Sequence, residues 1–101
     1  MIVEGTKENF QDALQKGIVL VDFFATWCGP CKMLHPVLEE VLEEENLTIV
    51  KVDIDKNESL AVEYGVMSVP TMILFKDGHE MSKSIGYKDK QTLLNWIRES
   101  I

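Results

Sequence analysis

The apolar run from Ile18 to Ala25 constrains the fold of this chain more than any other feature. It is rich in β-branched and aromatic side chains, and a single ionisable residue, Asp22, interrupts it. A strand with one solvent-exposed face alternates apolar and polar residues, whereas a nearly continuous apolar run is typical of a central strand buried on both faces. The run therefore predicts the middle strand of a sheet that has helices on both sides.

The segments around this run alternate between helical and extended patterns. Apolar residues at helical spacing follow it directly and predict the longest helix, with a stripe made of Leu34, Val37, Leu38, Val41 and Leu42. Strands are expected at residues 1–3, 48–54, 71–76 and 80–85, and shorter helices after caps at Thr6 and Asn57. A final helix carries Leu93, Leu94, Ile97 and Ile101.

This order indicates a mixed sheet. Strands separated by helices are expected to be parallel, whereas the tight-turn pair Asp77-Gly78 predicts that the last two strands are antiparallel. With 101 residues and 46% hydrophobic residues, we expect one domain, residues 1–101, whose core needs no cross-links.

Charge and the N-terminus limit the partners. The chain has 17 acidic and 10 basic residues, a net charge of −7, which is unfavourable for binding nucleic acid or an anionic membrane. Residues 1–10 do not have a basic stretch followed by a long apolar one, and no apolar run is long enough to span a bilayer. We therefore expect a cytoplasmic protein without nucleic-acid or membrane partners.

The only two cysteines, Cys28 and Cys31, are three residues apart and leave three interpretations open: metal ligands, a structural clamp, or a redox pair. A structural zinc site normally needs two such pairs, so metal binding is disfavoured, although His35 follows Cys31 by one helical turn. Cys28 begins the predicted long helix, whose positive end stabilises a thiolate and makes it nucleophilic. Cys31 lies one turn later, close enough to bridge to Cys28.

Asp22 is the second chemical feature. Burial of a carboxyl group costs desolvation, so its pKa is expected to rise, which would let it take a proton near neutral pH. An aspartate near a strand end that reaches water is the alternative. Lys51, in the next strand, shares a face with Ile49 and Asp53 and is as consistent with a lysine that extends to solvent as with a buried partner.

With these residues in view, the chain resembles the thioredoxin family over nearly its whole length. The matching segments are WCGPCK within VDFFATWCGPCKM, then KVDIDKN, YGVMSVPTMILFKDG and SIGY, in order. The resemblance implies the α/β thioredoxin fold, a central mixed sheet of about five strands flanked by four helices. It also implies a protein-disulfide reductase that works by dithiol–disulfide exchange and takes part in cell redox homeostasis.

The resemblance also implies roles for individual residues. Cys28, at the exposed start of the helix, would be the nucleophile. Cys31, one turn deeper, would be the resolving cysteine, and the two would form the redox disulfide. Asp22 would be the buried proton acceptor and Lys51 the residue that modulates it. Supporting residues would be Trp27, Gly29 and Pro30, and clients would bind at Met67, Val69, Pro70 and Gly86, with a cis peptide bond before Pro70.

The resemblance also implies which cofactors and partners this chain would have. No bound cofactor or metal is expected, because electrons would come from NADPH or ferredoxin through a thioredoxin reductase. The other partners would be client proteins that contain disulfides, and we expect a monomer. The alternative hypothesis is a thioredoxin-like scaffold subunit of a partner complex, whose function would not depend on the cysteines.

Overall fold

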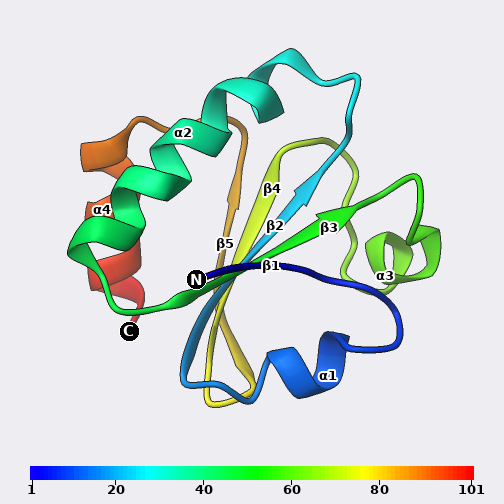
Figure 1. The fold of residues 1–101 in the computed structure, drawn as a ribbon, viewed down its shortest axis with the longest axis horizontal. Coiled ribbons are helices and arrows are strands. Elements are labelled where there is room, and N and C mark those ends of the chain that lie inside the picture. The colour runs from blue at the N-terminus through cyan, green and yellow to red at the C-terminus, as the bar shows by residue number, and fades with distance from the viewer.

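The computed structural model describes residues 1–101 as one sheet covered by helices (Figure 1). It contains five strands and four helices. In chain order they are β1 (Ile2–Glu4), α1 (Phe10–Ala13), β2 (Ile18–Phe24), α2 (Gly29–Glu44), β3 (Thr48–Asp53), α3 (Glu58–Glu63), β4 (Thr71–Lys76), β5 (His79–Ile85) and α4 (Lys90–Ser100).

The strands lie in the order β1-β3-β2-β4-β5, so the apolar run forms the middle strand, as predicted. β1, β3 and β2 are parallel, and β5 is antiparallel to β4. The expectation of a parallel arrangement is wrong for β4, which pairs antiparallel to β2 although α3 precedes it. The six residues of α3 rise only about 9 Å, less than half the length of a strand, so the chain enters β4 at the edge where β3 ended.

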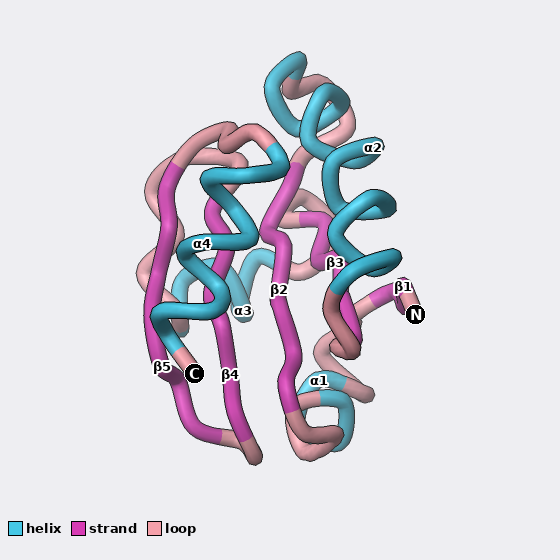
Figure 2. Tube along the Cα trace, turned by 90° about the vertical axis from the view of Figure 1, so that its left-hand side faces the viewer, coloured by secondary structure: helices cyan, strands magenta, loops and turns pink.

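Helices cover both faces of the sheet. α2 and α4 lie on one face and α1 and α3 on the other (Figures 1 and 2). Along β2, successive side chains alternate between two core clusters: Leu20 packs with α2 and α4, whereas Val19, Val21 and Phe23 pack with α1 and α3. Residues Val19 to Phe23 are fully buried, which confirms the prediction that neither face of this strand is exposed to solvent.

The α1 and α3 side contains an aromatic cluster. Phe10 contacts Phe23, Tyr64 and Phe75, with ring centroids between 5.3 and 6.5 Å apart. Tyr64 meets Phe75 edge to face at 5.9 Å. Such geometries are favourable beyond the area that the rings bury.

Local capping differs from the sequence expectation at two positions. α1 begins at Phe10 with Asn9 in the N-cap position, because Thr6 and Asn9 bond to each other's backbone N–H groups at 2.8 and 3.2 Å. Asn57 does precede α3, but its side chain bonds to the backbone of Lys7 and Asp53 instead of capping the helix. Short polar side chains compete in this way for nearby backbone groups.

Ion pairs join the C-terminal end of α2 to α4. Lys90 pairs with Glu44, and Arg98 pairs with Glu44 and Glu45. These contacts are at the opposite end of α2 from the cysteines. None of the helices has the length and apolarity needed to cross a membrane.

Gly5 provides a test of the packing between the β1–α1 connection and the sheet. A Cβ atom at this position would lie 2.5 Å from Val50 Cγ1 and 2.8 Å from Val52 Cγ2, in the α1 and α3 side of the core. We expect Gly5→Ala to destabilise the protein by about 1–3 kcal/mol, because an overpacked core must shift. Gly29→Ala is the matched control, since its Cβ would meet nothing within 4 Å. Urea unfolding of the oxidised forms measures both, and equal stabilities would contradict this packing.

Candidate active site

The site begins where β2 ends and α2 starts. Cys28 occupies the N-cap position of α2 with φ −90° and ψ 113°, and a proline follows in the first turn, where its missing N–H leaves no helical bond unmade. The Sγ atom of Cys28 accepts a hydrogen bond from the backbone N–H of Cys31 at 3.2 Å. The sulfur thus takes the place of a capping oxygen and lies at the positive end of a helix of 16 residues.

Cys28 and Cys31 are joined as a disulfide, with Cα atoms 5.3 Å apart. We expected Cys28 to be exposed and Cys31 to be deeper, but their exposed fractions are 5% and 3%. The bonded sulfurs pack against Phe24, Ile54 and Val69, which covers both. The two cysteines are therefore distinguished by their neighbours: Cys28 caps the helix, and Cys31 lines the cavity described below.

Asp22 lies in the middle of β2 and is fully buried. It points to the face covered by α2, and neither of its carboxylate oxygens has a hydrogen-bond partner. This burial raises the pKa of Asp22 to about 6, and the positive charge of Lys51 offsets part of the rise. The alternative of an aspartate that reaches water is wrong, because the helices close over this strand.

Lys51 lies beside Asp22 on the parallel strand β3. Its Nζ atom is 3.7 Å from Asp22 Oδ2, an ion pair too long for a hydrogen bond, and 4.6 Å from the centre of the Phe24 ring. The exposed fraction of its side chain is 16%, so it extends along the protein surface instead of into bulk water. The structure thus brings together the acid and the lysine that the sequence could only suggest as partners.

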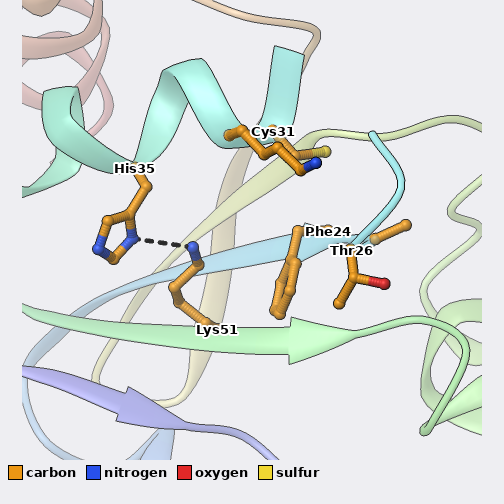
Figure 3. Close-up of a pocket in the computed structure, with 7 residues that line it drawn as sticks. Phe24, Thr26, Cys31, His35 and Lys51 are labelled. Carbon is orange, nitrogen blue, oxygen red and sulfur yellow. Dashed lines mark hydrogen bonds between the residues drawn. The ribbon is translucent and has the colours of Figure 1, made fainter. Parts of the chain in front are cut away.

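An open cavity of about 390 Å³ lies between Lys51 and Cys31. Figure 3 shows Cys31 and His35 reaching down from α2 while Lys51 rises from β3, with Phe24 and Thr26 beside them. The complete lining is Phe24, Ala25, Thr26, Cys31, Lys32, His35 and Lys51. The cavity thus extends from Cys31 to Lys51, the ion-pair partner of the buried Asp22.

Residues predicted to bind clients gather on the other side of Cys28. The Val69–Pro70 peptide is cis, and the carbonyl oxygen of Val69 lies 3.7 Å from Cys28 Sγ. Gly86 N donates to Pro70 O at 2.8 Å, and its φ of 92° suits glycine. Trp27 and Met67 present 68% and 94% of their surface to solvent, so this edge is apolar and uncovered.

Two contacts near the site were not predicted from the sequence. Trp27 Nε1 donates to Asp55 Oδ2 at 2.9 Å, which fixes the exposed indole ring. The Nδ1 atom of His35 lies 3.0 Å from Lys51 Nζ. No sequence signal indicated the first contact. For the contact between His35 and Lys51, the sequence placed His35 one helical turn after Cys31 but did not show which strand packs against that part of the helix.

The metal alternative would need ligands besides the cysteine pair. The structure does not bring three or more His, Cys, Asp or Glu side chains together in an arrangement that could hold an ion. His35 is instead paired with Lys51, and His79 lies at the exposed start of β5.

Known proteins resemble this chain over nearly its full length. The Thioredoxin family model matches residues 1–99. A thioredoxin from Chlamydia trachomatis is 53% identical over 96% of both chains, and one from Bacillus subtilis is 45% identical over 99% of this chain and 98% of its own. Among solved structures, a single-residue mutant of a thioredoxin from Halobacterium salinarum superposes with a TM-score of 0.89 at 39% identity, covering 99% of this chain and 88% of the other.

The raised pKa of Asp22 predicts how stability depends on pH. Near pH 4 the carboxyl group begins to ionise in the unfolded chain, whereas the folded protein keeps it protonated up to about pH 6. Stability therefore falls as the pH rises through this window, by about 3 kcal/mol for a shift of about two units. We expect Asp22→Asn to be about as stable as the wild type at pH 4 and more stable by up to about this amount at pH 8.

Urea unfolding of the oxidised proteins at several pH values measures the difference. Asp12→Asn is the control, because it removes a carboxyl group exposed on α1. The burial of an ionised Asp22 would not be costly if Asp22→Asn and the wild type changed in parallel over the whole range.

Proposed function

Because the chain belongs to the thioredoxin family, and is a thiol–disulfide oxidoreductase that reduces protein disulfides, we propose that Cys28 is its nucleophile and Cys31 its resolving cysteine. The observation that carries the assignment is the position of Cys28 Sγ at the N-cap of α2, where it accepts a backbone hydrogen bond. An anionic sulfur gains from both the bond and the helix dipole, so the thiolate needed for attack is favoured at this cysteine.

The exchange then takes two steps. The Cys28 thiolate attacks one sulfur of a client disulfide, which forms a mixed disulfide and releases the other client sulfur as a thiolate. Cys31, deprotonated, attacks Cys28 Sγ, which forms the Cys28–Cys31 disulfide and releases the second client sulfur. Two electrons pass from the dithiol to the client, and the product is the bonded form seen in the structure.

We assign Asp22 the role of proton acceptor for the Cys31 thiol. With a pKa of about 6, it is mostly ionised at neutral pH yet basic enough to hold a proton, which suits general-base catalysis. Lys51, 3.7 Å away, keeps this pKa from rising further, and the cavity that Cys31 and Lys51 share supports a proton path between them.

The apolar edge beside Cys28 is the proposed client site. The backbone of Val69 lies next to Cys28 Sγ and offers groups for pairing with an extended client segment, a form of β-augmentation. Trp27, with its indole ring fixed by Asp55, and the exposed Met67 would contact apolar side chains of the client, and Gly86 leaves room for its backbone. Gly29 and Pro30 shape the turn that presents Cys28.

Membership of the family implies two classes of partner, a reductase and client proteins with disulfides. We propose that a thioredoxin reductase supplies the electrons from NADPH or ferredoxin, that the chain needs no cofactor of its own, and that it acts as a monomer in the cytoplasm. The cytoplasm is a reducing compartment, in which the disulfide formed in each cycle would be reduced again instead of accumulating.

Single cysteine variants test the two roles. Cys31→Ser should stop after the first step and accumulate a one-to-one mixed disulfide with a model protein disulfide, because no second thiol can release it. Cys28→Ser should form no mixed disulfide and reduce clients only at the uncatalysed rate. Non-reducing electrophoresis and intact mass measurement distinguish the two species.

The same variants test the scaffold alternative. Catalysed reduction by Cys28→Ser, or a mixed disulfide that forms through Cys31, would contradict the assignment of the nucleophile. A partner complex that keeps its full activity with both cysteines replaced would show instead that the fold, and not the disulfide chemistry, is what that partner uses.

A further inference from the structure

The proposed mechanism leaves one titratable side chain of the cavity without a role. His35 is on α2, one turn after Cys31, and its ring lies beside the end of the Lys51 side chain (Figure 3). The Nδ1 atom is 3.0 Å from Lys51 Nζ, whereas the carboxylate of Asp22 is 3.7 Å from the same nitrogen. The ammonium group is thus within hydrogen-bond distance of the imidazole but not of the carboxylate.

The identity of the two groups determines the direction of this hydrogen bond. A lysine ammonium has three donors and no acceptor, so the Nδ1 atom of His35 must accept with its lone pair. The ring is therefore neutral in this arrangement and has its proton on Nε2. That proton points toward Glu39, whose Oε1 atom is 3.9 Å away, too far for a direct bond.

The bond to His35 has a consequence for Asp22. Both carboxylate oxygens are buried and unpaired, although a cation that could donate to them lies less than an ångström beyond hydrogen-bond distance. A charge-assisted bond between ammonium and carboxylate is stronger than one between ammonium and imidazole. We propose that His35 is a positioning residue: its neutral ring accepts a hydrogen bond from Lys51 and holds the ammonium group out of direct contact with Asp22.

The other charged groups around this cluster do not replace His35 as the acceptor. Besides the Phe24 ring, the structure pairs Lys51 Nζ with His35 and Asp22, and from β4 the neighbour of Asp22 is the apolar Met72. The charged and titratable side chains that surround the cluster are Lys32, His35 and Glu39 from α2, Lys51 and Asp53 from β3, Glu4 from β1, and Lys56.

Such positioning would matter for the second step of exchange. Direct contact with Lys51 would stabilise the ionised form of Asp22, lower its pKa and make it a weaker base toward Cys31. By holding Lys51 back, His35 keeps the carboxylate basic. This consequence rests on the proposed role of Asp22, whereas the positioning itself is a property of the folded chain.

Titration of the Asp22 carboxyl group by carbon NMR tests the inference directly. The oxidised protein is used, so that no thiol titrates in the same range. In His35→Ala, the ammonium group loses its acceptor and moves to Asp22, and the Asp22 midpoint should fall by about one pH unit. In His35→Asn, the side-chain oxygen replaces Nδ1 as acceptor, and the midpoint should return toward the wild-type value.

Two further variants show whether the effect passes through Lys51. In a Lys51→Met background, His35→Ala should no longer shift the Asp22 midpoint, because the group that His35 positions is absent. His79→Ala removes the only other histidine, exposed on β5, and should leave the midpoint unchanged. The inference is overturned if His35→Ala leaves the midpoint unchanged or raises it, if His35→Asn shifts it as far as His35→Ala, or if the shift persists without Lys51.

A kinetic measurement separates this inference from the proposed function. The rate at which Cys31 resolves a preformed mixed disulfide is followed against pH, and its midpoint in His35→Ala should move to lower pH by the same amount as the titration of Asp22. If the titration shifts and the kinetic midpoint does not, His35 positions Lys51 as inferred, but Asp22 is not the base in the second step.

Discussion

The desolvation of one carboxyl group is the constraint on which the electrostatics of this site depend. Asp22 lies in the central strand of the sheet with no hydrogen-bond partner and no access to water, and its pKa rises to about 6. Its nearest cation lies on the adjacent strand and is itself bonded to a helix on the same face. The acidity of the site therefore depends on the sheet register and on how α2 crosses it, and any change that admits water or moves that helix would alter the chemistry.

The position of the disulfide also depends on how β2 leads into α2. β2 supplies the acid and then leads directly to the N-terminus of α2, so the helix end that favours a thiolate lies at the edge of the sheet above the buried carboxyl group. The cis Val69–Pro70 segment comes from elsewhere in the chain and completes the site next to Cys28. One strand, one helix and one loop thus bring together the buried acid, the sulfur that caps the helix and the cis-proline segment.

The sequence was sufficient for the features that depend on local pattern. The apolar run predicted the central strand, the apolar stripe after it predicted a long helix that begins at Cys28, and the interruption at Asp22 suggested a buried acid. The features that it did not give depend on distances between elements. The antiparallel entry of β4 follows from the shortness of α3. His35 resembles any polar residue on a helix surface until the register of β3 places Lys51 beneath it. The bond between Trp27 and Asp55 joins two loops and leaves no trace in either segment.

The two sides of the sheet hold different parts of the molecule. The acid, its lysine, the histidine and the cavity all belong to the side covered by α2, whereas the aromatic cluster of Phe10, Tyr64 and Phe75 fills the other side and contacts none of them. Substitutions among those rings can adjust how long the protein survives heat or proteolysis without changing its acid–base properties. Stability and the acid–base properties of the site can thus be changed separately, each through its own layer.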